Sequence, residues 1–124
     1  MLKSEHEQNT VTEAEINLLH QQVCYALSDP TRILILYILK EGPRSVGELT
    51  ARMKLPQSTV SRHLRVLRDR SILSLEKRGT SNLYTIADTR IVDALDLLRQ
   101  VLNQQLTEQA KLTAAIQNTI PLKE

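Results

Sequence analysis

The sequence is poor in aromatic residues and in cysteine. Among its 124 residues there is no Phe, no Trp and only three tyrosines, so Leu, Ile and Val must fill the interior. Recognition of nucleic acid by stacking bases on exposed aromatic rings is correspondingly disfavoured. The single cysteine excludes a disulfide within the chain, and with it the small secreted folds that depend on such bonds.

Long hydrophobic segments and catalytic motifs are missing as well. No run of about 18 apolar residues could span a bilayer, and the first ten residues are too polar for a secretion signal. We find no Gly-rich phosphate loop, nucleophile elbow or catalytic carboxylate or Cys/His pair, so we expect no enzyme activity and no cofactor. The chain is apolar enough to form a core, which predicts one cytoplasmic domain over residues 1–124, folded from 12 to 118 with flexible ends.

Positive charge is concentrated in the middle of the chain. Residues 30–90 carry twelve Lys or Arg against five Asp or Glu, whereas the flanking segments, 1–29 and 91–124, are net acidic. Eight of the basic residues lie between 52 and 78. This pattern indicates a surface directed at a polyanion, with a solvated charged face as the alternative.

Apolar spacing predicts two helices in the first third of the chain. Residues 12–26 carry apolar side chains at three- and four-residue steps, which is typical of one stripe on an amphipathic helix. Ser28-Asp29-Pro30 then supplies a cap and a first turn for a second helix. Residues 33–39 are apolar on all sides, so this helix is expected to be central and buried and to stop at Gly42-Pro43.

A third helix begins at a capping box, in which Ser45 accepts a hydrogen bond from the first turn and Glu48 reaches back to the cap. It runs to about Lys54, where Leu55-Pro56 breaks it. From about Gln57 a fourth helix follows, with a polar, mostly basic outer face and an apolar inner face. The inner face consists of Val60, Leu64 and Leu67.

Beyond the fourth helix the apolar period changes to two, which predicts a β-hairpin. Its first strand carries Leu73 and Leu75, and its second carries the apolar residues from Leu83 to Ile86. Residues 77–82 are expected to form the connecting loop, whose Gly and Asn suit positive φ.

The last segment, from Asp88 to about Asn118, predicts one long helix with a single apolar seam. A seam of this length exceeds what so small a domain can cover, so we expect it to meet a partner. The seam consists of Ile91, Leu95, Leu98, Leu102, Leu106 and Ile116.

Residues 44–87 therefore combine two short helices, a tight break and a basic hairpin, which is the pattern of a winged helix-turn-helix. The expected fold class is mainly α, with about five helices and a small β-hairpin wing. The second helix of such a pair fits the major groove of DNA. The alternative is a protein-interaction module, in which the same basic helix binds an acidic partner and has no preference for a DNA sequence.

The side chains of this region suit three kinds of DNA contact. Base edges are the expected partners of Gln57, Ser58, Thr59, Arg62 and His63. Phosphates are the expected partners of Ser45, Ser61, Arg65 and Arg68. The DNA backbone or the minor groove is the expected partner of the wing residues Lys77, Arg78, Thr80 and Asn82. We expect Arg62 to form a bidentate contact with guanine. For His63, the alternative to a base contact is a role in helix packing.

Three segments carry a recognisable pattern. They are Ala26-Leu27-Ser28-Asp29-Pro30-Thr31-Arg32, the stretch from Gln57 to Leu67 with its Ser-Arg-His-Leu core, and the Arg78-Gly79 wing. In order and spacing, over roughly residues 16–106, the chain resembles the ArsR/SmtB family of bacterial winged-helix repressors.

The resemblance implies a homodimeric repressor that binds an inverted repeat in a promoter and leaves it when an inducer binds. It places the dimer interface in the first and last helices, which agrees with the need of the long seam for a partner. The residues concerned are Ile16, Leu19, Ile91, Leu95, Leu98, Leu102 and Leu106.

Many members of this family sense metals, and the resemblance identifies the positions of their ligands here. These positions hold Thr50, Arg52, Asp93, Leu95, Leu106 and Gln109. Only Asp93 is a usual ligand, whereas a transition metal needs several N or S donors, so we expect no metal at either usual site. A repressor with a non-standard site, made of His20, Cys24 and an N-terminal arm that carries His6, is the alternative.

The single cysteine, Cys24, has two interpretations. A lone cysteine is most often buried and acts as a small hydrophobic residue, which is our main expectation. The alternative is a thiol switch, through a disulfide between two subunits or an oxidised thiol, and it would make the inducing signal a redox one.

Overall fold

The computed structural model describes residues 10–119, with side chains to residue 118. The chain divides into two units, one ending at Thr89 and one beginning at Arg90, and each is described by itself. The expected flexible ends and His6 lie outside the described residues, which exclude 1–9 and 120–124.

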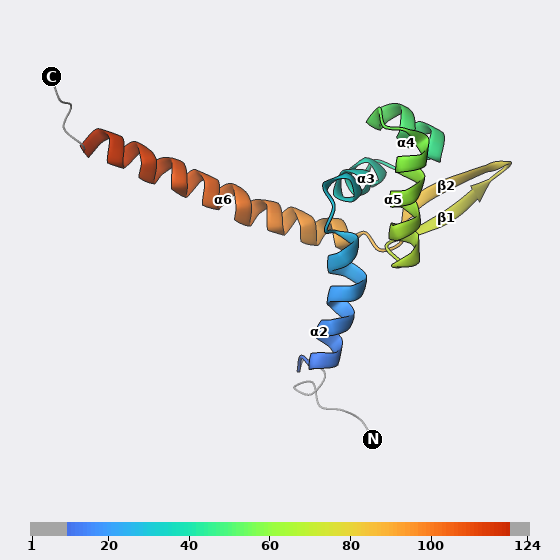
Figure 1. The fold of residues 1–124 in the computed structure, drawn as a ribbon, viewed down its shortest axis with the longest axis horizontal. Helices are drawn as coiled ribbons and strands as arrows, with labels where there is room; N and C mark the ends of the chain where they lie inside the picture. Colours follow the sequence, from blue (N-terminus) through green and yellow to red (C-terminus); the bar gives the residue numbers. More distant parts are fainter. Residues whose placement is uncertain (1–9, 120–124) are drawn as a thin grey trace. The chain divides into compact units, whose positions relative to one another are not determined.

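The first unit contains four α-helices, a short π-helix and one hairpin in the part described (Figure 1). Its elements are α2 (Glu13–Leu19), η1 (His20–Cys24), α3 (Pro30–Lys40), α4 (Val46–Met53), α5 (Gln57–Asp69), β1 (Leu73–Arg78) and β2 (Ser81–Ile86). Helix α5 packs against α3, α4 and β1, so it lies at the centre of this unit. The predicted order of helices and hairpin is confirmed.

The first predicted helix is present but changes its winding part-way. Thr12 caps α2 by accepting a hydrogen bond of 3.1 Å from the backbone N–H of Glu15, and the five residues of η1 then form a π-helix. The side chains of α2 stay exposed, so the apolar stripe is uncovered at Ile16 and Leu19, whereas Ala26 at its end is buried. Side-chain spacing carries no signal for the π turn, because this turn differs from an α-helical turn only in its backbone hydrogen bonds, which run from i to i+5.

Helix α3 forms the middle of the core. Asp29 caps it by accepting the backbone N–H of Thr31 at 2.8 Å, which also lowers the pKa of the Asp29 carboxyl. Ile35 and Leu36 are fully buried, whereas Leu34 is 52% exposed. The prediction of burial on all sides is therefore wrong for one side of α3, because its neighbours cover only the rest of the helix.

Helix α4 begins and ends, and helix α5 begins, as the sequence predicts. Ser45 and Glu48 form the capping box, with bonds of 3.1 and 3.0 Å, and Lys54 ends α4 with a left-handed backbone at φ 57°. Pro56 then precedes α5. The predicted inner face of α5 is completely buried and consists of Val60, Leu64 and Leu67.

The hairpin is longer and its turn tighter than the sequence suggests. Strands β1 and β2 pair in antiparallel register from Leu73 opposite Ile86 to Arg78 opposite Ser81, which leaves a turn of two residues. Gly79 has φ 60°, the conformation required at the first position of a type II′ turn. The predicted six-residue loop is therefore wrong, because a turn with Gly in this position lets the ladder continue to its tip.

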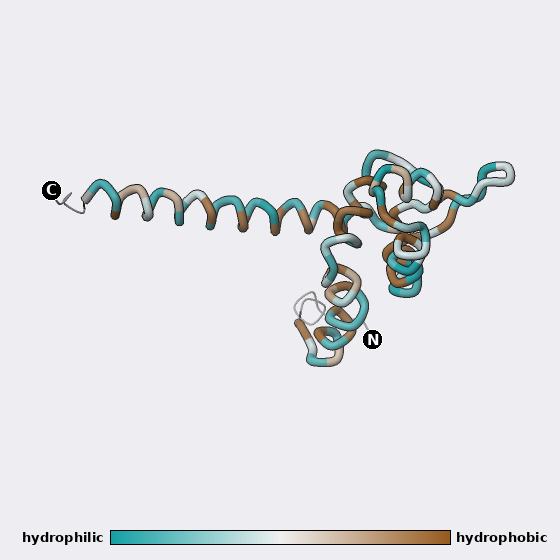
Figure 2. Tube along the Cα trace, turned by 45° about the horizontal axis from the view of Figure 1, so that its top comes forward, coloured by the Kyte–Doolittle hydropathy of each residue, from teal (hydrophilic) through white to brown (hydrophobic). Residues whose placement is uncertain are grey.

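The second unit consists of α6 (Arg90–Thr119). Hydrophobic residues recur along its whole length (Figure 2), as the predicted seam requires. Within the described residues no helix combines the length and apolar character needed to cross a membrane.

Candidate nucleic-acid interface

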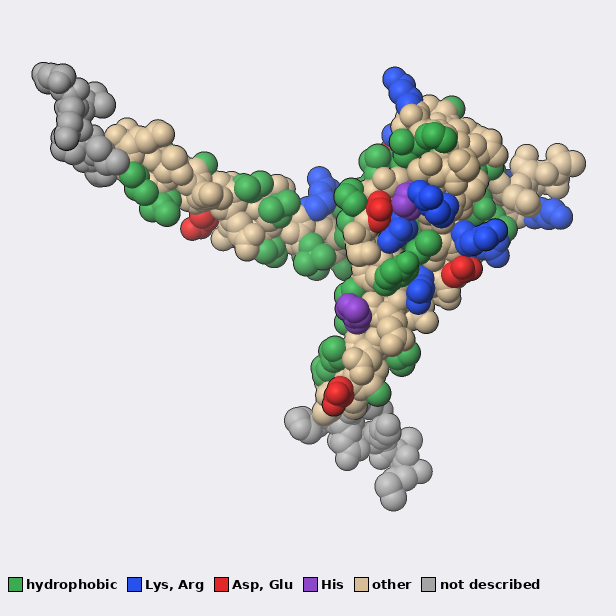
Figure 3. Space-filling model, in the orientation of Figure 1, with side chains coloured by type: hydrophobic (Ala, Val, Ile, Leu, Met, Phe, Trp, Pro, Cys, Tyr) green, Lys and Arg blue, Asp and Glu red, His purple; other side chains and the backbone are tan. Residues whose placement is uncertain are grey.

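The outer face of α5 is polar and open to solvent. Lys and Arg side chains gather over the region of α5 and the hairpin (Figure 3). The exposed residues of α5 include Gln57, Ser58, Ser61, Arg62, Arg65 and Arg68, and Thr59 is half-buried. These positions lie opposite the buried inner face, so the amphipathic pattern itself turns them outward.

Three arginines on this face have no partner in the described chain. Within residues 10–118, the side chains of Arg62, Arg65 and Arg68 form no hydrogen bond or ion pair. A hollow beside them is lined by Ser61, Arg65, Arg68, Asp69 and Tyr84. The face therefore presents guanidinium donors and hydroxyls together, which suits an anionic partner.

His63 differs from the other residues predicted to contact bases, because it is only 8% exposed. Its Nδ1 lies 3.2 Å from a guanidinium nitrogen of Arg32, and since arginine can only donate, Nδ1 is the acceptor. The ring proton then lies on Nε2. This placement supports the packing role for His63.

Arg32 is an important residue to which the sequence assigned no role. It is 7% exposed, and its guanidinium donates to the carbonyl oxygens of Ala26 at 2.8 Å and Tyr25 at 3.1 Å. It also reaches the hydroxyl of Ser28 at 3.3 Å, in addition to the ring of His63. The Asp-Pro-Thr-Arg segment of the sequence was the available signal, although only the fold shows what this arginine contacts.

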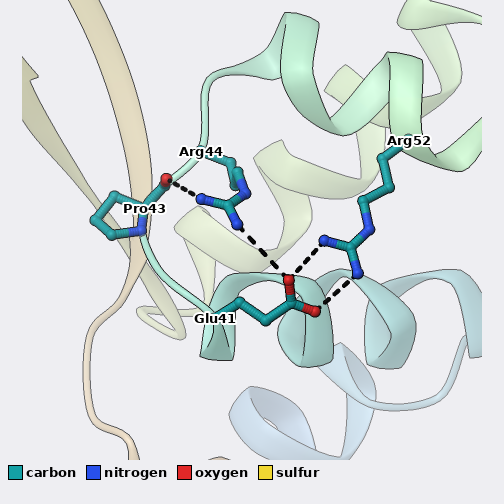
Figure 4. Close-up of polar contacts among 4 residues, drawn as sticks. All are labelled: Glu41, Pro43, Arg44 and Arg52. Atoms are coloured by element: carbon teal, nitrogen blue, oxygen red, sulfur yellow. Dashed lines mark hydrogen bonds and ion pairs between the residues drawn. The ribbon is translucent and has the colours of Figure 1, made fainter.

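A second group of charged residues joins the end of α3 to α4 (Figure 4). Arg52 donates to both carboxylate oxygens of Glu41 at 2.7 Å, and Arg44 lies 3.7 Å from the same carboxylate. The Arg52 bond is the main cause that lowers the pKa of Glu41, and in return it raises the pKa of Arg52. Glu48 likewise has a lowered pKa, because the backbone N–H of Ser45 donates to it.

The wing is joined to the helices by a short backbone bridge. Arg44 and Tyr84 exchange two backbone hydrogen bonds, of 3.1 and 2.7 Å, which fix β2 beside the residue that precedes the cap of α4. At the other end of the hairpin, the predicted wing residues are exposed, and Arg78 forms an ion pair of 2.9 Å with Glu76. The exposed wing residues are Lys77, Arg78, Thr80 and Asn82.

Known proteins are similar to this chain in sequence and fold. Residues 29–74 match the family described as "Bacterial regulatory protein, arsR family". The chain is 36% identical over 81 residues to the HTH-type transcriptional regulator MJ1325 of Methanocaldococcus jannaschii, across 64% of this chain and 91% of that protein. The chain belongs to the arsR family. It is a transcriptional regulator with a helix-turn-helix.

Solved structures agree with this arsR-family fold. The crystal structure of Mycobacterium tuberculosis Rv0081 gives a TM-score of 0.69 at 33% identity, over 77% of this chain and 96% of that one. A Mycobacterium bovis fragment of Mb0332, described as a homodimeric winged helix-turn-helix DNA-binding domain, gives 0.67 at 23% identity, over 86% and 93%. The predicted winged helix-turn-helix is confirmed.

Within the described residues, the candidate metal-ligand positions of this arsR-family chain do not come together as a metal site. Arg52 is bound to Glu41, and no three His, Cys, Asp or Glu side chains gather for a metal within the described residues. Cys24 is exposed, so the expectation of a buried cysteine is wrong. The apolar stripe of the first helix suggested that other elements would cover this segment, but in the single chain the side chain of Cys24, at the end of η1, is open to solvent.

The residues expected at the dimer interface fall into two groups. In α2 and along α6 they are about half exposed or more, whereas Ile91 is half-buried and Leu95 is buried. The exposed group consists of Ile16, Leu19, Leu98, Leu102 and Leu106. These apolar side chains are left uncovered in the single chain.

Proposed function

We propose that this arsR-family regulator binds double-stranded DNA with α5 in the major groove. The observation that carries the proposal is the outer face of α5, where Arg62, Arg65 and Arg68 are exposed and have no partner among residues 10–118. A guanidinium has five N–H donors, and base edges and phosphates are the acceptors that would use them. The face therefore suits a ligand that supplies both.

Different parts of the face suit different contacts. Arg62 lies in the first half of α5, the end of a recognition helix that approaches base edges, and its planar donors match the two acceptors of guanine. Arg65 and Arg68, beside the hydroxyl of Ser61, suit phosphates of one strand. Lys77 at the end of β1 suits the backbone that flanks the groove.

The proposed active form is a homodimer on an inverted repeat. Apolar side chains of α2 and α6 are exposed in the single chain, and a second copy would cover them. A two-fold axis would place two α5 helices about 34 Å apart, one turn of DNA. Such a dimer on a promoter blocks polymerase, so we propose a repressor that an inducer releases.

A selection from random duplexes tests the proposal directly. Immobilised wild-type protein is expected to enrich one sequence with two-fold symmetry. Its affinity for the enriched duplex, measured by fluorescence anisotropy, should fall steeply with salt and exceed that for a shuffled duplex by about a thousandfold. Lack of any enriched sequence would contradict DNA recognition and favour the alternative, an acidic partner protein.

Cys24 provides a second proposal, for the inducing signal. Its side chain is exposed in the single chain, so an oxidant can reach it there. We propose that hydrogen peroxide oxidises this thiol to a sulfenic acid, with release of water, and that this change weakens DNA binding. The Cys24→Ser variant should then keep its affinity after peroxide treatment, whereas a variant that still releases the duplex would show that the signal acts elsewhere.

A further inference from the structure

The back of α5 is held by a group of side chains that the DNA-binding proposal does not use. Arg70 directly follows α5, and its guanidinium lies 4.6 Å from the ring centre of Tyr25. The guanidinium of Arg32 lies 5.5 Å from the centre of the same ring. Both distances are within the range of cation–π attraction, so one ring joins two arginines.

The same two arginines bind the backbone of the first helical segment. Arg70 donates to the carbonyl oxygen of Gln21 in η1 at 3.1 Å, across 49 positions of sequence. Arg32 donates to the carbonyl oxygens of Tyr25 and Ala26, as described above, and to the ring of His63 in α5. Helix α5 is therefore fixed to the end of the first helical segment at two points.

The two points lie on one side of α5. His63 and Arg70 are seven residues apart, which is close to two helical turns, so they stand one above the other. Of the unpartnered arginines, Arg65 and Arg68 project from the opposite side, because they are two and five residues from His63, or about 200° and 140° around the helix, and Arg62 lies about 100° from His63. Rotation of α5 about its axis would break the contacts at the back and move the face at the front.

We propose that Tyr25, Arg32 and Arg70 are positioning residues for DNA recognition. They form a clamp that fixes the rotation of α5 and so determines how Arg62 meets a base pair. This inference rests on the proposed DNA binding. It concerns preference more than total affinity, because hydrogen bonds to base edges depend steeply on angle, whereas attraction between arginine and phosphate tolerates small displacements.

The chain offers a matched pair of variants at Tyr25 that leaves its charge unchanged. Tyr25→Phe keeps the ring between the two guanidiniums, and the tyrosine hydroxyl forms no hydrogen bond within the described residues. Tyr25→Leu keeps an apolar side chain but removes the ring. The electrostatic attraction to DNA is the same in both variants, so a difference between them reports on positioning.

The measured quantity is the ratio of affinities for the enriched duplex and for a shuffled duplex of equal composition, with wild type as reference. For Tyr25→Leu we expect this ratio to fall about three- to thirtyfold, while the affinity for the shuffled duplex and its salt dependence stay unchanged. Tyr25→Phe should keep the wild-type ratio. Circular dichroism and thermal unfolding confirm that each variant is folded at the assay temperature.

Arg70→Gln is a second variant, at a half-buried position, that leaves the ring of Tyr25 in place. Its control is Arg99→Gln in α6, which removes the same charge. Arg70→Gln should lower the ratio and Arg99→Gln should not.

The outcomes separate this inference from the proposed function. A wild-type ratio in Tyr25→Leu and Arg70→Gln, or an equal loss of affinity on both duplexes by folded protein, would overturn the clamp and leave the DNA-binding proposal standing. A wild-type protein that prefers no duplex would overturn the proposed function and this inference with it.

Discussion

The arginines behind α5 and the arginines in front of it have the same chemistry and opposite surroundings. Behind the helix, Arg32 is buried and every contact described for it is to a partner in the same unit. In front, Arg62 is exposed and has no partner within the described residues. The difference separates arginines that hold the fold from arginines that are available to a ligand.

The wing repeats this contrast at smaller scale. Arg78 is paired with Glu76, whereas its neighbour Lys77 forms no ion pair in the part of the chain described. The net charge of a segment therefore does not measure its capacity for binding an anion. What matters is which cations keep their donors unused.

Removal of an arginine behind α5 should change the protein most. Arg32→Met should lower the free energy of unfolding by about 2–4 kcal/mol, because carbonyl oxygens and the ring of His63 lose a charged donor in a buried place. Urea denaturation followed by circular dichroism measures this loss. Arg65→Met on the open face is the control, with a change within about 0.5 kcal/mol. Equal losses in the two variants would remove the distinction.

The next effect concerns the arginines in front of α5. Arg65→Ala and Arg68→Ala should each weaken binding to the enriched and shuffled duplexes alike, by about 1.5 kcal/mol or roughly tenfold. Each should also reduce the slope of log affinity against log salt by about 1, because one phosphate contact is lost. Anisotropy titrations at several salt concentrations measure both values. An unchanged slope would show that these guanidiniums do not meet phosphates.

A smaller effect is expected when a paired arginine is set free. Glu76→Gln removes the partner of Arg78 and should raise the affinity for every duplex about twofold. The comparison variant is Glu108→Gln in α6, which makes the same change of charge in the other unit and should have less effect. If the two variants behave alike, the gain comes from net charge and the pairing of Arg78 is irrelevant.

The smallest effect should be found at the exposed pair of Glu41 and Arg52. The pKa of the Glu41 carboxyl is lower in the folded protein than its usual value of 4.5. The ionised carboxylate therefore stabilises the folded state above that pH, and this stabilisation is lost as the pH falls through the lower folded-state pKa. Arg52→Met removes the main cause of the lowering, so unfolding free energy should decline less between pH about 6 and about 3. The part due to Glu48 should remain, because its cause is the backbone of Ser45. An unchanged decline would show that the pair has no part in acid stability.

Sequence patterns predicted the elements that depend on local rules. A cap at Ser28 or Asp29, the capping box at Ser45 and the buried side of α5 follow from short spacings, and the structure has all of them, with Asp29 as the cap. The winged helix-turn-helix followed from the order of these elements.

Features that depend on distant partners could not be predicted in this way. The π turn at η1 is bound by Arg70, which is 49 positions from Gln21, and the burial of His63 depends on Arg32. Exposure of Leu34 and Cys24 likewise depends on which elements cover them, which periodicity within one helix does not determine. For the same reason the sequence identified the basic face but not the clamp behind it.

We propose that the unpartnered face of α5 recognises a DNA sequence, with Arg62 as the residue that determines the preferred base. The most direct test is to measure affinities of wild type and Arg62→Ala for the enriched duplex and for duplexes that change each base pair in turn. We predict that Arg62→Ala loses about 1–3 kcal/mol of discrimination at one base pair of each half-site and keeps the preferences elsewhere. Equal weakening of every duplex, with all preferences intact, would contradict the claim.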